Sequence, residues 1–146
     1  MTSSLCSGTS MKSINTSLCA ASDEHTFYQW STSESTAQTY DVYVRWQVPS
    51  DINTNAITAI SVSGWRTTSS DTISASVYDT DDTSTPCVNG TSVATTNTTW
   101  TSTALTLTSC NQWSANGMIL FKFHMTATNG NFSRLGEITI SYTSAY

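Results

Sequence analysis

Apolar and polar residues alternate along most of the chain from residue 26 onward, which predicts β-strands rather than helices. The clearest example is YDVYVRWQV, residues 40–48, because successive side chains of a strand point to opposite sides. One side then carries five apolar or aromatic residues: Tyr40, Val42, Val44, Trp46 and Val48. We expect this face, with Trp46, to be buried in the core. The strand ends at Pro49, since proline has no N–H to offer a neighbouring strand.

Seven further segments are rich in Val, Ile, Thr and aromatic residues and are separated by turn-forming clusters: residues 26–30, 56–65, 72–79, 91–95, 100–108, 118–128 and 136–142. Between the last two segments, Asn129 and Gly130 favour a tight hairpin. No segment has the apolar periodicity of a helix. The sequence therefore predicts an all-β protein, a jelly-roll-like antiparallel β-sandwich of about eight strands over residues 24–146.

Residues 1–23 differ from the rest, because they are small and hydroxylated, with few apolar anchors. We predict that they form an extended N-terminal arm. The first residues have neither the basic region nor the apolar run of a signal peptide, so a signal has been removed or the sequence is an excerpt. No stretch approaches the ~18 apolar residues of a membrane span, and we expect no membrane insertion.

The amino-acid composition limits which kinds of molecule the protein can bind. The chain has 146 residues, enough for one domain with one core. Charged residues make up only 10% of it, whereas 53 residues are Ser or Thr. The net charge of −5 leaves no basic surface for nucleic acid or for an anionic membrane. The polar surface is therefore expected to be hydroxyl-rich and poor in charge.

The cysteines fall into two local pairs, which indicates disulfides and an oxidising compartment: Cys6 with Cys19, and Cys87 with Cys110. Other pairings remain open, because four cysteines allow three connectivities. The close spacing of a zinc site is absent. Four sequons add candidate glycosylation sites at Asn15, Asn89, Asn97 and Asn131, which also fits a secreted protein. Sequons arise easily by chance in a chain this rich in Ser and Thr.

Catalysis is poorly supported by the sequence. Glu34 and Glu137 are the most notable acids, but two carboxylates alone do not define a glycosidase. His25 and His124 are the available bases for a serine nucleophile, yet no Gly-x-Ser-x-Gly elbow occurs. No glycine-rich phosphate loop is present. We therefore expect a non-enzymatic protein without a resident cofactor.

One acidic turn is a candidate calcium site, because carboxylates that follow a strand can supply oxygen ligands: Asp79, Asp81 and Asp82. Asp71 or another loop would have to complete the coordination shell. The turn lacks the spacing and the glycine of an EF-hand, and a solvated turn without metal is the alternative interpretation.

Carbohydrate binding has stronger candidates, because aromatic rings flanked by polar groups stack on sugars. Four residues are candidates for such a platform: Tyr43, Tyr78, Trp65 and Trp113. The two tyrosines point away from the apolar side of their strands. Trp113 has an equally good alternative role, as a plug over one end of the sandwich near Cys110.

Several sequence segments occur along the chain in an order that is known from other β-sandwich domains. These are TFYQW at residues 26–30, YDVYVRWQVPSD at 40–51, the separated Trp100 and Trp113, and LGEITISY at 135–142. This order is similar to that of jelly-roll β-sandwich domains in secreted bacterial fibre and surface-appendage proteins. The resemblance implies an extracellular, non-enzymatic domain that assembles with copies of itself or displays a binding surface. It does not include the arm.

Edge strands lead to the main functional prediction. A sandwich exposes unpaired backbone groups at its edges, and proteins often protect them with lysine, yet this chain has only two lysines. A strand from a neighbouring copy is one way to cover such an edge. In the arm, Leu5, Ile14 and Leu18 are candidate assembly contacts. The arm is otherwise a tether, or folds back on its own domain through Cys6 and Cys19.

We therefore predict a structural subunit or head domain of an extracellular homo-oligomeric fibre or surface appendage. The alternative is a carbohydrate-binding module or adhesin that binds surface glycans.

Overall fold

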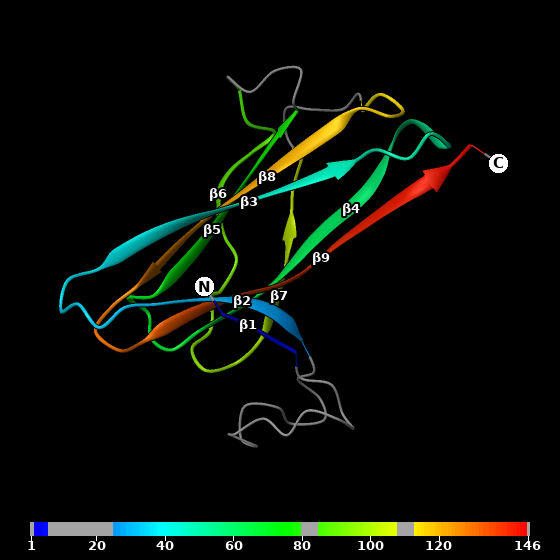
Figure 1. The fold of residues 1–146 in the computed structure, drawn as a ribbon. Helices are drawn as coiled ribbons and strands as arrows, with labels where there is room; N and C mark the ends of the chain where they lie inside the picture. The colour runs from blue at the N-terminus through cyan, green and yellow to red at the C-terminus, as the bar shows by residue number, and fades with distance from the viewer. Residues whose placement is uncertain (1, 6–24, 80–84, 108–112, 146) are drawn as a thin grey trace.

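The computed structural model describes residues 2–5, 25–79, 85–107 and 113–145, and it has two antiparallel β-sheets that face each other (Figure 1). The five-stranded sheet, sheet A, contains in spatial order β1 (Thr2–Leu5), β2 (Thr26–Ser31), β9 (Phe132–Ser144), β4 (Ile52–Arg66) and β7 (Thr101–Leu105). The four-stranded sheet, sheet B, contains β3 (Gln38–Gln47), β8 (Met118–Ala127), β5 (Thr72–Asp79) and β6 (Val88–Ser92).

This architecture confirms the predicted all-β, jelly-roll-like sandwich. Within the described residues every regular element is a strand, and no helix there is long and apolar enough to cross a membrane. Strand β5 has the predicted bounds, whereas β9 begins four residues before the predicted segment, at Phe132. Strand β1 lies within the predicted arm and pairs with the outer edge of β2.

The turn at Asn129 and Gly130 has the predicted geometry but does not join a hairpin. Both residues have positive φ, 32° and 76°, as a tight Asn-Gly turn requires. The strands that it connects, β8 and β9, belong to different sheets. The hairpin prediction is therefore wrong, because the turn residues fix the local bend and not the partner of the next strand.

The core is densest over the central strands of sheet B. In β8 the alternation is obeyed in full, and one face is completely buried: Ile119, Phe121, Phe123, Met125 and Ala127. Alternate residues of β5 face the same core, and Ile60, Val62 and Leu135 meet them from sheet A. Burial of this apolar area is the main stabilising term of the fold.

Strand β3 departs from this pattern. Val42 and Val48 are buried as predicted, but Tyr40 is 42% exposed and Trp46 is only partly buried. The expected burial of Tyr40 is therefore wrong, and Trp46 packs against the core as expected but is only partly enclosed. The physical reason is position, because β3 is the outer strand of sheet B and covers only one flank of the core.

Candidate functional site

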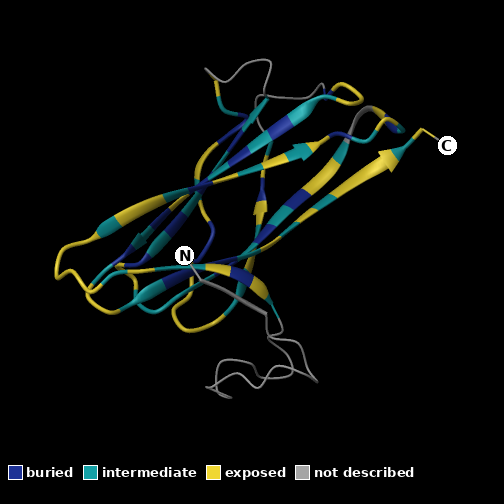
Figure 2. Cartoon of the chain, in the orientation of Figure 1, coloured by how far each residue is buried: buried dark blue, intermediate teal, exposed yellow. Residues whose placement is uncertain are grey.

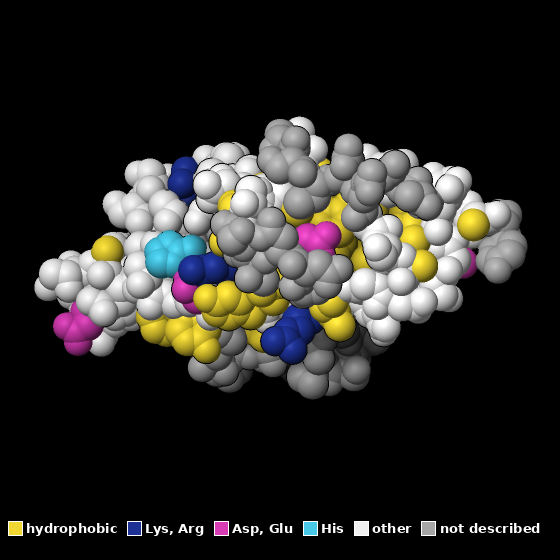
Figure 3. Space-filling view, turned by 90° about the horizontal axis from the view of Figure 1, so that it is seen from above, with side chains coloured by type: hydrophobic (Ala, Val, Ile, Leu, Met, Phe, Trp, Pro, Cys, Tyr) yellow, Lys and Arg dark blue, Asp and Glu magenta, His cyan; other side chains and the backbone are white. Residues whose placement is uncertain are grey.

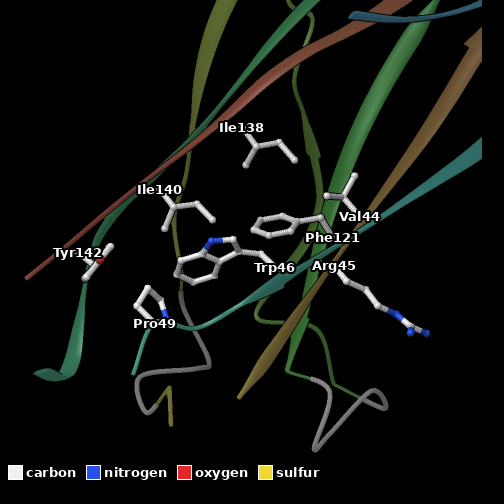
Figure 4. Close-up of a pocket in the computed structure, with 8 residues that line it drawn as sticks. All are labelled: Val44, Arg45, Trp46, Pro49, Phe121, Ile138, Ile140 and Tyr142. Carbon is white, nitrogen blue, oxygen red and sulfur yellow. The ribbon is translucent and has the colours of Figure 1, made fainter. Parts of the chain in front are cut away.

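An apolar cleft of about 440 Å³ opens between β3 and the second half of β9. Residues from three strands and one loop line it: Val44, Arg45, Trp46, Pro49, Phe121, Ile138, Ile140 and Tyr142 (Figure 4). We call this feature the edge cleft. The indole of Trp46 lies among Pro49, Ile140 and Phe121, whereas the Arg45 guanidinium points away from the ring.

The edge cleft is open because β2 covers only the first half of β9. Their pairing runs from Phe132, opposite Ser31, to Leu135, opposite Tyr28. Among the described residues, no strand pairs with residues 138–143 of β9 on the side away from β4. We call residues 138–143 the free half of β9; Figure 2 shows much of this half as exposed.

The opposite wall of the cleft is also an unpaired edge. Strand β3 pairs with β8 from Gln38 to Gln47 and with no other strand in the described part of the chain. The cleft is therefore bounded by two strand edges whose outward N–H and C=O groups have no strand partner there. Such edges readily accept a further strand.

The adjoining part of the same flank is closed by Trp30 of β2. Its indole N–H donates a hydrogen bond to the Gln38 carbonyl at 3.1 Å, and its ring stacks on Tyr40 with centroids 5.0 Å apart. The loops at this end are also tied together, because the N–H of Asn129 donates to the Glu34 carbonyl at 2.8 Å. We call this part the closed half of the flank and the part with the edge cleft the open half. In the closed half β2 lies beside β9 and contacts β3, and in the open half no described strand takes this place.

A buried carboxylate fixes the turns at the closed end. The Asp71 side chain is fully buried and accepts four hydrogen bonds, from the N–H and hydroxyl of Thr68 at 2.9 and 2.8 Å and from the N–H and hydroxyl of Thr128 at 3.1 and 3.2 Å. It thereby joins the turn before β5 to the turn after β8. Because its oxygens are occupied by these donors, Asp71 is unsuited to complete a calcium site.

The other predicted calcium ligands are not brought together in the described residues. Asp79 ends β5 and is partly buried, while Asp81 and Asp82 lie outside the described residues. The described part of the chain contains no group of three or more His, Cys, Asp or Glu side chains that could hold a metal ion. The calcium site stays a prediction, without the contribution expected from Asp71.

Two of the predicted sugar-binding residues lie on the outer face of sheet B. Tyr43 is 57% exposed and pairs with Lys122, whose Nζ lies 5.8 Å from the ring centroid. Tyr78 is on the same face, diagonal to Tyr43 across β8, because Tyr78 pairs with Leu120. These rings are accessible from solvent, and hydrogen-bonding groups are close by.

A small charge cluster accompanies Tyr43. The Asp41 carboxylate contacts Lys122 Nζ at 3.1 Å and His124 Nδ1 at 2.6 Å. Burial acts to raise the pKa of Asp41, but hydrogen bonds from His124 and Lys122 outweigh it and hold this pKa below 3.8. The hydrogen bond to Asp41 raises the pKa of Lys122 above 10.5. In Figure 3 a histidine side chain (cyan) lies beside basic and acidic side chains on this surface.

The two tryptophans predicted to bind sugar are less accessible than the two tyrosines. Trp113 is only 4% exposed and belongs to the core, so its assignment as an exposed sugar-binding ring is wrong. Its burial agrees instead with the alternative role as a plug. Trp65 lies on the outer face of sheet A, where it stacks on Phe132 with centroids 4.9 Å apart. One of its ring faces is therefore already covered.

Trp65 is also part of a cluster around Arg134. The Arg134 guanidinium lies 4.4–4.8 Å from the ring centroids of Phe27, Trp65 and Phe132, and its Nε donates to Gln29 at 3.0 Å. Burial lowers the pKa of Arg134 to about 10, so it remains charged at neutral pH. The rings stabilise this cation, which makes the cluster a structural one.

Glu137 and Glu34, the two acids singled out in the sequence, lie on different elements of the fold. Glu137 is exposed and bonds to His25 Nδ1, while Glu34 lies in the loop between β2 and β3. Burial acts to raise the pKa of Glu137, but the hydrogen bond from His25 outweighs it and lowers this pKa. The lining of the edge cleft itself contains no carboxylate, histidine or cysteine.

The remaining predicted sites are only partly within the described residues. Cys87 is buried and disulfide-bonded, whereas Cys6, Cys19 and Cys110 lie outside the described residues, so the pairings stay predictions. Asn89 is exposed, and the side chain of Asn97 accepts a hydrogen bond from Arg66 at 2.9 Å. Asn131 donates its amide to Thr128. Asn15, Ile14 and Leu18 lie outside the described residues, and Leu5 is described only as part of β1.

Comparisons with protein-family models and with curated protein sequences give no match. Among solved structures, the chain is similar to TmCBM61, a carbohydrate-binding module in complex with β-1,4-galactotriose. The TM-score is 0.52 at 7% sequence identity, and the match covers 83% of this chain and 72% of that one. At this identity the likeness concerns the β-sandwich fold and not a binding site.

Proposed function

We propose that this protein is a non-enzymatic structural subunit that assembles outside the cell by accepting a β-strand from another copy into the edge cleft. The observation that carries the proposal is the coincidence of two unpaired strand edges with an apolar cleft between them. An unpaired edge supplies backbone hydrogen bonds to an incoming strand, and an apolar cleft receives every second side chain of that strand.

The dimensions of the cleft suit a strand. The free half of β9 has six residues and spans about 20 Å at roughly 3.3 Å per residue. A cavity of about 150 Å³ holds benzene, so the edge cleft has room for about three side chains of that size. A strand of this length presents three side chains to one face, which matches this room.

The chemistry of the lining favours a strand over a sugar. Sugar sites combine an exposed ring with convergent polar groups. Here Val44, Ile138 and Ile140 are aliphatic, and the one charged residue of the lining, Arg45, is directed away from the Trp46 ring. Aliphatic side chains provide no hydrogen bonds for hydroxyl groups but pack well against Leu, Ile and Val.

The test places one charge in the cleft and a matched charge outside it. Ile140→Asp puts a carboxylate against Trp46, whereas Thr139→Asp puts the same group on the exposed side of the same strand. We expect wild type and Thr139→Asp to form polymers in sedimentation velocity and electron microscopy, and Ile140→Asp to remain a folded monomer. A monomeric wild-type protein, or Ile140→Asp polymers like those of wild type, would overturn the proposal.

A second candidate function is carbohydrate binding on the outer face of sheet B. Exposed Tyr43 and the nearby Tyr78 support it, as does the fold shared with a carbohydrate-binding module. β-1,4-galactotriose and a glycan array are the probes. Binding that Tyr43→Ala abolishes and Ile140→Asp retains would favour this function. Absence of any glycan binding would remove it.

A further inference from the structure

We infer that the strand that fills the edge cleft is residues 14–20 of a second copy of the chain, here called the donor segment. This inference rests on the proposed function, because it names the partner of the same site. Four arguments support it: the pattern of the donor segment, its charge, the unsuitability of the residues nearest to β2, and the place where the arm joins the domain.

The donor segment has the pattern of a half-buried strand. In INTSLCA, alternate positions carry Ile14, Thr16, Leu18 and Ala20, and the intervening positions carry the polar Asn15 and Ser17 together with Cys19. Two large aliphatic side chains on one face can then enter the cleft beside Trp46. The segment has seven residues, enough to run along the six residues of the free half of β9.

The donor segment also carries no charge. Burying an unpaired charge in an apolar site is strongly unfavourable, so a neutral segment enters the cleft at the lowest desolvation cost. Its polar positions would face solvent and hydrogen-bond with water. Its backbone groups would pair with the edges of β3 or β9.

The residues that directly precede β2 are poor occupants. A straight continuation of β2 along β9, in the register that pairs Tyr28 with Leu135, would bring residue 23 opposite Ile140. The bulge of β9 beside Val62 and Gly64 can shift this register by one residue. The side chain opposite Ile140 would then be Asp23 or Glu24, and either acid would be buried against apolar groups. A segment farther from β2 is therefore required.

The arm joins the domain next to the start of the free half of β9. Leu5 of β1 lies opposite Thr26, and His25 bonds to Glu137, the residue before the free half of β9. Both ends of residues 6–24 are thus held beside the place where pairing between β2 and β9 stops. No described residue of the same chain fills the cleft, and, in keeping with the proposed function, we assign the donor segment to another copy. One arm given and one cleft filled per subunit generates a head-to-tail assembly, which is a ring if the rotation between copies closes and a filament if it does not.

A mixing experiment tests the donor separately from the cleft. The donor variant is Ile14→Asp/Leu18→Asp, with Asn15→Asp/Ser17→Asp as the matched control on the polar face. The acceptor variant is Ile140→Asp, with Tyr142→Asp as a second, more exposed position in the same lining. Circular dichroism verifies that each variant is folded, and sedimentation velocity gives its assembly state.

We expect neither the donor variant nor the acceptor variant to polymerise alone. Their mixture should form 1:1 dimers and nothing longer, because only the acceptor variant has an intact arm and only the donor variant has an intact cleft. The polar-face control should polymerise like wild type. A synthetic peptide of residues 12–22 should raise the Tm of the donor variant, and the same peptide with Leu18→Asp should not.

The other outcomes separate the two proposals. If the donor variant polymerises while both acceptor variants do not, another segment fills the cleft, and only this inference fails. If the mixture stays monomeric and the peptide has no effect, the arm does not exchange between copies, and the inference also fails. If the acceptor variants polymerise like wild type, the cleft has no part in assembly, and the proposed function fails as well.

Discussion

The flank formed by β2, β3 and β9 has a closed half and an open half, and the same strands run through both. In the closed half β2 pairs with the first residues of β9, and Trp30 joins it to the start of β3. In the open half no described strand lies between β3 and the free half of β9, so Trp46, Ile138 and Ile140 remain only partly buried. The edge cleft therefore arises because no described strand pairs with this part of β9, and not because its residues are less apolar.

The largest expected effect compares two aromatic residues of the cleft that differ in burial. Phe121 is fully buried in the core, whereas Trp46 is only partly buried and lines the opening of the edge cleft. Phe121→Ala should lower the free energy of unfolding by about 4 kcal/mol, as expected for a buried Phe→Ala change. Trp46→Ala should lower that of the monomer by only about 1–2 kcal/mol, because the indole already contacts water.

Urea denaturation of both variants at a concentration where the protein is monomeric checks this comparison. Equal losses of stability would mean that Trp46 is as enclosed as Phe121 in solution, and the open half would then not be open.

The next effect concerns the hydrogen bonds that fix the closed end. Asp71→Ala leaves the partly buried donors of Thr68 and Thr128 without their acceptor and should cost about 3 kcal/mol. Asp71→Asn, which keeps an acceptor oxygen, should lose less. Asp51→Ala is a control, because Asp51 lies at the other end of the flank and is less buried. A loss for Asp71→Ala no larger than for this control would contradict the structural role of the network.

The smallest effect is a pH dependence on the outer face of sheet B. Because the pKa of Asp41 is lowered in the folded state, its contribution is complete above pH 3.8 and is lost as the pH falls through the lowered pKa. The pKa of Lys122 is raised, so its share is complete below pH 10.5 and is lost above the raised pKa. The pair is half-exposed, which limits its contribution to about 0.5 kcal/mol.

Thermal denaturation of wild type and Asp41→Asn across this pH range measures the contribution. The difference in Tm should vanish in strong acid and shrink at high salt. A Tm difference that persists unchanged in strong acid would show that the carboxylate charge is not its source.

The sequence was sufficient for the strands and for much of the core. The alternation in residues 118–128 predicted the buried face of β8, and that in residues 72–79 predicted β5 to the residue. The alternation in residues 40–48 is equally regular, yet β3 is an edge strand and its face is partly open. Periodicity reports which residues share a side, and it does not report whether another strand covers that side.

The candidate site was missed for the same reason. Residues 136–142 are predicted as the last strand and Trp46 as part of an earlier one, but the juxtaposition of Ile138, Ile140 and Tyr142 with Trp46 depends on the arrangement of distant strands. Trp113 shows the converse, because an aromatic residue in a loop gives no sign of whether it is buried. The signal that did exist was the low lysine content, because lysine is a common protection of exposed strand edges.

Amide hydrogen exchange of the assembled protein tests the central claim most directly, because β9 contains both halves of the comparison. The account predicts that amides of residues 138–143 that point away from β4 exchange rapidly in the monomeric donor variant and are protected in wild-type polymers. Amides of residues 132–135, which β2 already covers, should have the same protection in both. Equal exchange of residues 138–143 in monomer and polymer would contradict the claim that a strand fills the edge cleft.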